Sequence, residues 1–269
     1  MIRSYFGLTS TPFCLEHVEL LPHQQEIYDT LMVHSRQGGL CLLLGDPGTG
    51  KSVIKEALKQ QQDKRLVVVT VARTLHTYGN TIKILCQAFS IETDEGSYFK
   101  IEKRLIEEAY SLHRQGKMLV TIIDDAHFLE MDTLRRLRLL FEDFPKSHNV
   151  ILIGQPALLH QMSLKVNEDI KSRVTYSIIM PKLVAVDMQS FILAELDRVT
   201  LAHNTFDTDS LSLVIRSSEG ILRRARNLTL GCLLEAVRSQ KKHVDLAMVN
   251  RVLIHPHWRI DQEVELVRS

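Results

Sequence analysis

A glycine-rich segment of eight residues could bind a phosphate group. Residues 45–52, GDPGTGKS, match the spacing G-x-x-x-x-G-K-[ST]; they follow an apolar run at residues 40–44 and lead into a helical pattern. In a strand, glycine loop and helix of this order, backbone N–H groups and the helix N-terminus attract phosphate oxygens. We expect Lys51 to reach the β- and γ-phosphates of a nucleotide and the Ser52 hydroxyl to bind Mg²⁺. The residues expected to contact the nucleotide are Gly45, Asp46, Pro47, Gly48, Thr49, Gly50, Lys51, Ser52 and Val53.

Two adjacent aspartates could complete a site for metal and water. The apolar run MLVTII at residues 118–123 predicts a buried strand, and Asp124 and Asp125 follow it directly. We expect Asp124 to hold the Mg²⁺ shell through water and Asp125 to activate the attacking water. The plainer interpretation is a solvated pair of acids at a strand end.

The composition describes an ordinary globular chain. Of 269 residues, 45% are hydrophobic and 24% are charged. A chain of this length and apolar content can form two domains. The four cysteines, at 14, 41, 86 and 232, form no C-x-x-C pair, which favours a reducing compartment and argues against a zinc site. No segment reads as a signal peptide or a membrane span, so we expect a cytoplasmic protein without membrane contact.

Charge is unevenly distributed along the chain. The net charge is only +1, but residues 216–259 contain nine Lys and Arg against three Asp and Glu. This excess favours an anionic partner for the C-terminal part. A basic, solvated helical face would produce the same pattern.

Strand and helix patterns alternate in the first two thirds of the chain. Strands are expected at residues 40–44, 66–72, 118–123, 149–154 and 174–179, with helices between them. This alternation predicts an α/β fold with a parallel sheet flanked by helices. From residue 187 onward only helical periodicity remains, which predicts a small all-helical domain. The expected domains are an N-terminal lead-in at 1–38, a nucleotide-binding domain at 39–181, a helical lid at 182–255 and a tail at 256–269.

Several motifs resemble those of one family. The chain is similar to AAA+ ATPases, and more closely to the ExeA-like (general secretion pathway protein A) family. The resemblance rests on YFGLTSTPF, the phosphate loop, IIDDAHFL, ILIGQPALL and EGILRRARNL, in that order. It implies a P-loop NTPase of AAA+ type with a helical lid domain, bound ATP and Mg²⁺, ATPase activity, and a homo-oligomer, as a ring or filament, with ATP between subunits.

The same resemblance implies roles for residues outside the loop. Gln155 matches a polar sensor that contacts the γ-phosphate or the attacking water. Arg173 matches an arginine finger that reaches the nucleotide of a neighbouring subunit, where it stabilises transition-state charge. Arg223 matches a second sensor in the lid, and Arg224 competes for that role because one register slip exchanges the two.

The chain departs from the family at Asp125, where the family usually has glutamate. Aspartate is one methylene shorter, so its carboxylate is less able to reach the water that it must activate. We therefore expect ATP hydrolysis that is slow rather than absent.

Three functions fit these features. The chain is similar in size and architecture to the TniB/TnsC/IstB/MuB-like ATPases of mobile elements, which implies assembly on double-stranded DNA and recruitment of a transposase. Sequence-independent phosphate contacts would come from basic side chains. The candidates are Arg224, Arg226, Lys241, Lys242, Arg135, Arg136 and Arg138.

The alternatives are secretion and a switch that acts on protein partners only. ExeA-like proteins also carry a membrane span and a periplasmic wall-binding region, and neither pattern occurs in this sequence, which favours the mobile-element hypothesis. The sequence leaves the protein-only switch open.

Overall fold

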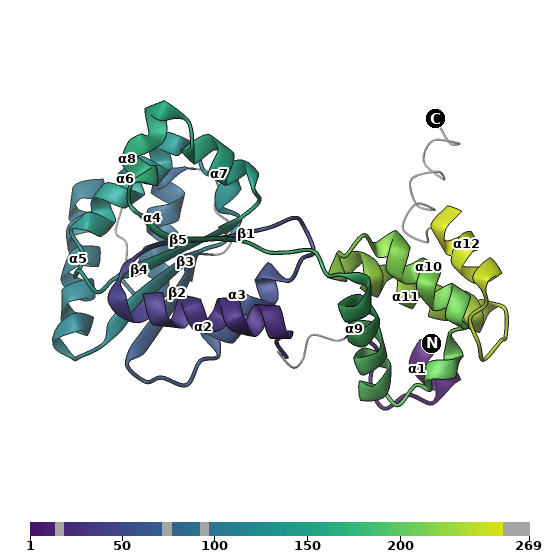
Figure 1. Ribbon diagram of the computed structural model, residues 1–269. Helices are drawn as coiled ribbons and strands as arrows, with labels where there is room; N and C mark the ends of the chain where they lie inside the picture. The colour runs from purple at the N-terminus through teal and green to yellow at the C-terminus, as the bar shows by residue number, and fades with distance from the viewer. Residues whose placement is uncertain (14–18, 72–76, 92–96, 255–269) are drawn as a thin grey trace, which may run out of the picture. The chain divides into compact units, whose positions relative to one another are not determined.

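One sheet of five parallel strands organises the first part of the molecule (Figure 1). The computed structural model describes residues 1–13, 19–71, 77–91 and 97–254. The strands are β1 (Gly39–Leu44), β2 (Leu66–Val71), β3 (Met118–Ile123), β4 (Asn149–Gly154) and β5 (Val174–Ile179). Their order is β2-β3-β4-β1-β5. The predicted α/β fold with a parallel sheet is confirmed.

The strand sequences match their places in the sheet. The central strand β4 is buried along its whole length, whereas the edge strand β5 alternates between half-buried and exposed residues. A parallel strand covered on both faces reads as a continuous apolar run, and an edge strand does not need to. This is why VTYSII of β5 is a weaker sequence signal than NVILIG of β4.

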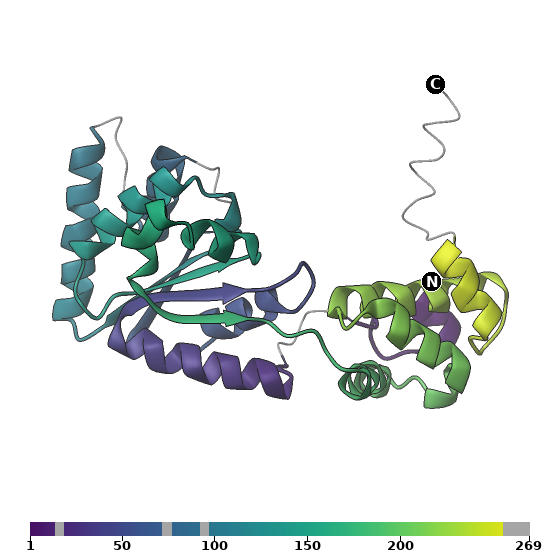
Figure 2. The same ribbon diagram turned by 45° about the horizontal axis from the view of Figure 1, so that its top comes forward.

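Helices cover both faces of the sheet (Figure 2). Successive side chains of a strand point to opposite faces. Cys41 and Leu43 of β1 therefore share a core with the helices α2 and α3, while Leu42 and Leu44 face the core under the remaining helices. The helices are α2 (Pro22–Gln37), α3 (Lys51–Lys59), α4 (Tyr78–Ala88), α5 (Tyr98–Arg114), α6 (Met131–Glu142), α7 (Ala157–Met162) and α8 (Glu168–Lys171). Two 3-10 turns, η1 (Ala126–Phe128) and η2 (Lys165–Asn167), lie between them.

The register of the strands places their carboxyl ends at one edge. Leu44 of β1 pairs with Gly154 of β4, and Leu152 of β4 pairs with Ile123 of β3. The segments that follow these three strands are the phosphate loop, the paired aspartates and Gln155. Ligands bind at this edge in open α/β sheets.

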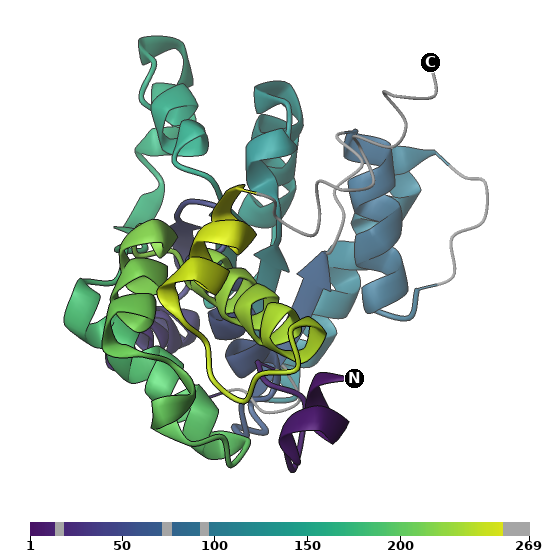
Figure 3. The ribbon, with the colours of Figure 1, turned by 90° about the vertical axis from the view of Figure 1, so that its right-hand side faces the viewer.

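A second compact unit is helical (Figure 3). It groups described residues 1–13, 47–49 and 181–254 around one apolar core. Its elements are α1 (Ile2–Phe6), α9 (Ala185–Arg198), η3 (His203–Thr205), α10 (Thr208–Ser218), α11 (Leu222–Arg238) and α12 (Leu246–Ile254). Leu8 lies in this core, so the first residues pack with the helices instead of with the sheet. The expected tail at 256–269 lies outside the described residues.

Candidate nucleotide-binding site

The phosphate loop joins β1 to α3 through two glycines with left-handed backbone. Gly48 has φ of 90° and Gly50 has φ of 103°, values that residues with a Cβ rarely adopt. Gly50 is the N-cap of α3, and its carbonyl accepts from Val53 N at 2.9 Å. The backbone N–H groups that begin α3 have no partner within the helix and can bind an anion.

Lys51 lies over the loop that precedes it. Its Nζ donates to the carbonyl oxygens of Gly45 at 2.7 Å and Asp46 at 2.9 Å. An ammonium carries three donors and no acceptor, so it suits carbonyl oxygens and phosphate oxygens equally. The loop thus holds a positive charge beside the start of α3, where the dipole also favours an anion.

Asp124 is held at two points directly after β3. Its Oδ1 accepts from Asp125 N at 2.9 Å, and its Oδ2 accepts from Lys55 Nζ at 2.7 Å. The Lys55 and Asp124 side chains are only 15% and 19% exposed. Sequence reasoning missed Lys55, although it lies one helical turn after Lys51 on α3.

The side chains at this point fit a magnesium ion. A hydroxyl from Ser52 and a carboxylate from Asp124 are the hard oxygen donors that Mg²⁺ prefers. Ser52 is exposed and lies three residues before Lys55, so it shares the helix face that meets Asp124. Both Asp124 oxygens already accept hydrogen bonds, which suits contact through a bound water. In the described residues no cluster of three or more His, Cys, Asp or Glu could hold a metal, so phosphate and water oxygens would complete the shell.

Asp125 begins the turn η1 with left-handed backbone, at φ 52° and ψ 33°. Asp and Asn adopt this conformation more readily than most residues with a side chain. The side chain is exposed at the carboxyl edge of the sheet. The position is open to a water molecule, as the predicted role requires.

Gln155 contacts His127, which sequence reasoning also missed. Gln155 Nε2 and His127 Nε2 are 2.9 Å apart, across 28 residues of sequence. Burial lowers the pKa of His127 below its ordinary value, and Asp125 acts in the opposite direction. The signal was available, because His127 stands three residues after Asp124 within the motif IIDDAHFL.

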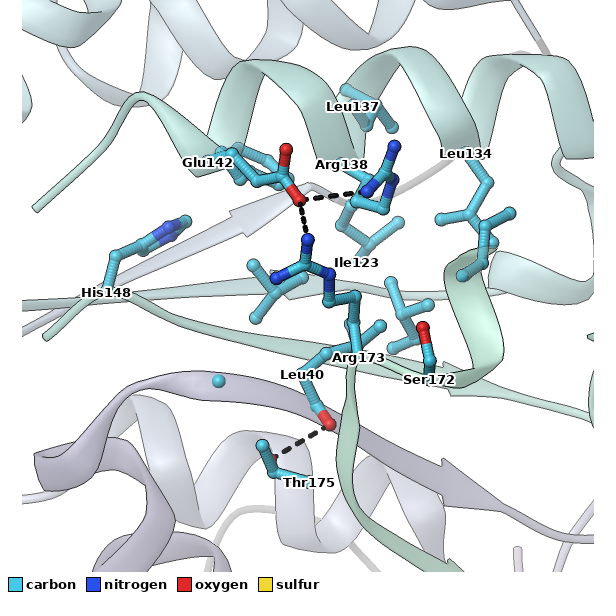
Figure 4. A pocket seen from close by; sticks show the side chains of 15 residues that line it. Leu40, Ile123, Leu134, Leu137, Arg138, Glu142, His148, Ser172, Arg173 and Thr175 are labelled. Atoms are coloured by element: carbon cyan, nitrogen blue, oxygen red, sulfur yellow. Dashed lines mark hydrogen bonds and ion pairs between the residues drawn. The ribbon is translucent and has the colours of Figure 1, made fainter. Parts of the chain in front are cut away.

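Arg173 is the one predicted site residue of the sheet unit that lies away from its own phosphate loop. It precedes β5, and Val174 pairs with Leu40 at the beginning of β1, whereas the loop follows the end of β1. Arg173 Nη2 is 3.1 Å from Glu142 Oε1, and its side chain is 60% exposed. Figure 4 shows Arg138 and Arg173 pointing to the same carboxylate, and these residues help to line a cavity of about 380 Å³.

The two lid arginines differ in their surroundings. Arg223 donates its backbone N–H to the carbonyl oxygen of Gly48 at 3.1 Å, and both residues belong to the helical unit. A Cβ on Gly48 would lie 2.6 Å from the Arg223 Cβ, so only glycine fits there. Arg224 instead pairs with Glu219, at 2.5 Å.

Many of the basic residues suggested for DNA contact are engaged within the chain. Arg135 donates to the Val166 carbonyl at 2.8 Å, Arg136 stacks over the Tyr78 ring, and Arg138 pairs with Glu142. Arg138 also lies 4.0 Å from Asp169 of α8, so each of the three contacts an element next to α6, and we leave them out of the DNA-contacting set. Arg216 and Arg238 of the helical unit are exposed.

Comparison with known proteins agrees with this geometry. Residues 34–162 match the family model described as an AAA domain. General secretion pathway protein A of Aeromonas hydrophila is 25% identical over 232 residues, which is 83% of this chain. The chain spans 42% of the length of that relative.

Two solved structures share the fold. ORC1 of Aeropyrum pernix, solved in complex with DNA, has a TM-score of 0.70 at 18% identity and covers 93% of this chain and 70% of its own. The RuvB Holliday junction branch migration motor of Thermotoga maritima has a TM-score of 0.54 at 16% identity. The match covers 90% of this chain and 71% of the RuvB chain.

No helix in the described residues has both the length and the apolar content that crossing a membrane requires.

The family match, the sequence similarity and the sheet built around a phosphate loop agree with one another. The chain therefore has the fold of an AAA+ P-loop NTPase, matches the AAA domain family over residues 34–162, and is similar in sequence to general secretion pathway protein A.

Proposed function

We propose that this chain is a cytoplasmic, ATP-dependent switch that assembles on double-stranded DNA and serves DNA transposition as an accessory ATPase. The observation that carries the nucleotide part is the convergence of the loop, the paired aspartates and Gln155 at one edge of the sheet. Parallel strands bring residues distant in sequence to a shared ligand site in this way.

Each site residue has a role in this proposal. Lys51 and the loop amides would hold the phosphates, while Ser52 and Asp124 would hold Mg²⁺, which offsets phosphate charge. Asp125 would orient the attacking water, with slow turnover as the consequence of its short side chain. A low rate suits a switch whose ATP-bound state must persist.

Residues from two further segments would sense the nucleotide. Gln155 would contact the γ-phosphate or the water. Arg173 would reach the nucleotide of a neighbouring subunit in a ring or filament, and its exposure and its place at the end of the strands opposite to its own loop support that role. Arg223, whose main chain bonds to the loop, would be the lid sensor in preference to Arg224.

Two observations support DNA as the partner. Of the proteins that share the fold, ORC1 was solved in complex with DNA, and RuvB is described as a Holliday junction branch migration motor. The segment 216–259 is strongly basic, and Arg216 and Arg238 are exposed. Phosphate contacts by such residues confer affinity without sequence preference, and a transposase would be the protein that the assembled form recruits.

A second candidate is an ATPase of a secretion pathway. The sequence similarity to general secretion pathway protein A favours it. In that case the switch would act on a protein partner, and the basic face would be solvated.

Binding to a fluorescent random-sequence duplex, followed by anisotropy, tests the proposal. The protein is titrated with ATP, with a non-hydrolysable analogue and without nucleotide, at about 50 and 200 mM salt. We expect nucleotide-dependent binding that weakens at least about tenfold at the higher salt. Lys51→Ala should abolish it, whereas Lys59→Ala, which removes an exposed lysine of the same helix, should not. ATP binding without DNA binding in any condition would favour the secretion candidate.

A further inference from the structure

His127 packs between the ends of β3 and β4. It lies in η1, directly after the paired aspartates, and its backbone abuts Gly154. A Cβ on Gly154 would lie 3.2 Å from His127 N and 3.5 Å from His127 Cβ. The absence of a side chain at Gly154 therefore allows the turn to pack against the end of β4, which places the imidazole beside Gln155.

The two ring nitrogens of His127 have different surroundings. Nε2 contacts the Gln155 amide at 2.9 Å, while Nδ1 is buried and makes no hydrogen bond within the described part of the chain. A neutral imidazole has one N–H donor and one acceptor nitrogen. The surroundings therefore decide which nitrogen carries the proton.

A proton on Nδ1 would leave a buried N–H without an acceptor. Buried N–H groups without an acceptor are rarer in proteins than buried acceptors without a donor, and they destabilise the fold. A proton on Nε2 avoids this defect, but it requires an acceptor on Gln155. Because the oxygen and nitrogen of an amide have nearly the same outline, the Gln155 amide can present Oε1 to His127.

We infer that His127 is the positioning residue for Gln155: its Nε2–H holds the amide Oε1, so that the amide NH₂ faces the nucleotide. The inference rests on the proposed contact between Gln155 and the γ-phosphate. Phosphate oxygens accept hydrogen bonds and repel a carbonyl oxygen, so only the NH₂ end of Gln155 stabilises ATP. Without His127 the amide could turn about its last bond and present the wrong end.

The same contact joins the two catalytic segments. Asp125 begins η1, and His127 lies within it, so the water-orienting carboxylate and the sensor amide are linked through one short turn. His127 touches neither the phosphate nor the water in this arrangement. Its effect on ATP passes through Gln155.

A double-mutant cycle tests the coupling. Dissociation constants for ATP and ADP with Mg²⁺ are measured for His127→Ala, Gln155→Ala and the double variant, together with thermal melts. Each single variant should lower the preference for ATP over ADP by about five- to tenfold, the equivalent of one net hydrogen bond. The double variant should lose no more than Gln155→Ala, because the histidine acts only through the amide.

Two further variants separate positioning from folding. His127→Gln supplies an NH₂ group at a similar reach and should restore much of the preference for ATP, which a purely structural role would not predict. His160→Ala, which removes an exposed histidine of α7, should leave the ratio unchanged. Additive losses in the cycle, or a full preference for ATP in a folded His127→Ala, would reject the inference.

Nitrogen-15 NMR of the histidine rings tests the same point in the unmodified protein. At neutral pH the shifts of His127 should report a proton on Nε2 and a bare Nδ1. A proton on Nδ1 would overturn the inference. If Gln155→Ala keeps the full preference for ATP, the proposed role of Gln155 is wrong. If Gln155→Ala loses the preference but His127→Ala keeps it, the role of Gln155 stands and only the role of His127 is wrong.

Discussion

At the scale of single residues, the backbone of Asp125 suits a short acid. Its φ of 52° lies in the left-handed region, which aspartate and asparagine tolerate better than longer side chains. A more effective base at this position would therefore strain the turn. Catalytic reach and local stability make opposite demands on one residue.

Asp125→Glu should raise the rate of ATP hydrolysis and slightly lower Tm, because the carboxylate reaches farther while the backbone is strained. Asp125→Asn should abolish hydrolysis and keep Tm and ATP binding, since asparagine suits the same backbone. Single-turnover assays and thermal melts measure both effects. Equal hydrolysis by Asp125→Glu and the parent chain would show that side-chain length is not limiting.

Lys55 controls the charge at the predicted metal position. Lys55→Met should destabilise the metal-free protein by about 2 kcal/mol, because Asp124 loses a charged hydrogen bond in a poorly exposed place. It should also lower the Mg²⁺ concentration needed for nucleotide binding, since a cation no longer competes for the carboxylate. Melts in EDTA and magnesium titrations with a fluorescent ATP analogue measure these effects.

The matched control for Lys55 is Lys59→Met, which breaks an exposed pair with Glu56 on the same helix. Exposed pairs contribute little, so this variant should behave as the parent chain. A higher magnesium requirement in Lys55→Met would contradict the charge argument and would indicate that Lys55 helps to orient Asp124 for the metal.

At the scale of elements, the arginines of α6 serve packing. Arg135 reaches from α6 to the Val166 carbonyl and to Asp169, so one side chain connects this helix to η2 and α8. Such a contact restrains the segment that leads to Arg173. The proposal of DNA contact therefore depends on the basic residues of the helical unit and not on those of α6.

Arg135→Ala should lower Tm and leave the affinity for DNA unchanged, because its guanidinium is occupied within the chain. Arg238→Ala should leave Tm unchanged and weaken DNA binding, since this side chain is exposed on α11. If Arg238 contacts a phosphate, its loss should also reduce the salt dependence of binding by about one ion. Anisotropy titrations over a range of salt, with melts of both variants, check the contrast.

At the scale of the whole molecule, the role proposed for Arg173 would make the nucleotide site of one chain depend on a neighbouring subunit. Its pair with Glu142 is exposed, and exposed pairs are worth at most about 1 kcal/mol, so the arginine can leave it readily. A neighbouring subunit could then receive the guanidinium at its own nucleotide. Assembly and hydrolysis would depend on each other.

Arg173→Ala should bind ATP normally and hydrolyse it about 10³-fold more slowly. Mixing it with Lys51→Ala should restore part of the activity, because the Lys51 variant lacks nucleotide but still supplies its arginine to a neighbour. Lys171→Ala, at an exposed position two residues away, is the control and should hydrolyse normally. Hydrolysis by the mixture, with sedimentation in the presence and absence of ATP, decides whether the arginine acts between subunits.

The sequence determined the fold and the center of the site because their signals are local. The phosphate loop needs glycines between a strand and a helix, and the apolar runs of β1, β3 and β4 require a covered parallel sheet. Asp124 was predicted from its place directly after an apolar strand, whereas Gln155 was predicted from the resemblance to a family. The register puts the ends of β3 and β4 at the same edge as the end of β1, where the loop begins.

Only the tertiary structure decided which side chains touch. Lys55 and Asp124 are 69 residues apart, and His127 and Gln155 are 28 apart, so no periodicity or spacing relates them. The parallel pairing of β5 with β1 also decides that Arg173, which precedes β5, lies at the end of the strands opposite to its own loop. Local sequence encodes backbone preference and burial, whereas the partner of a charged or polar group depends on which elements the whole chain brings together.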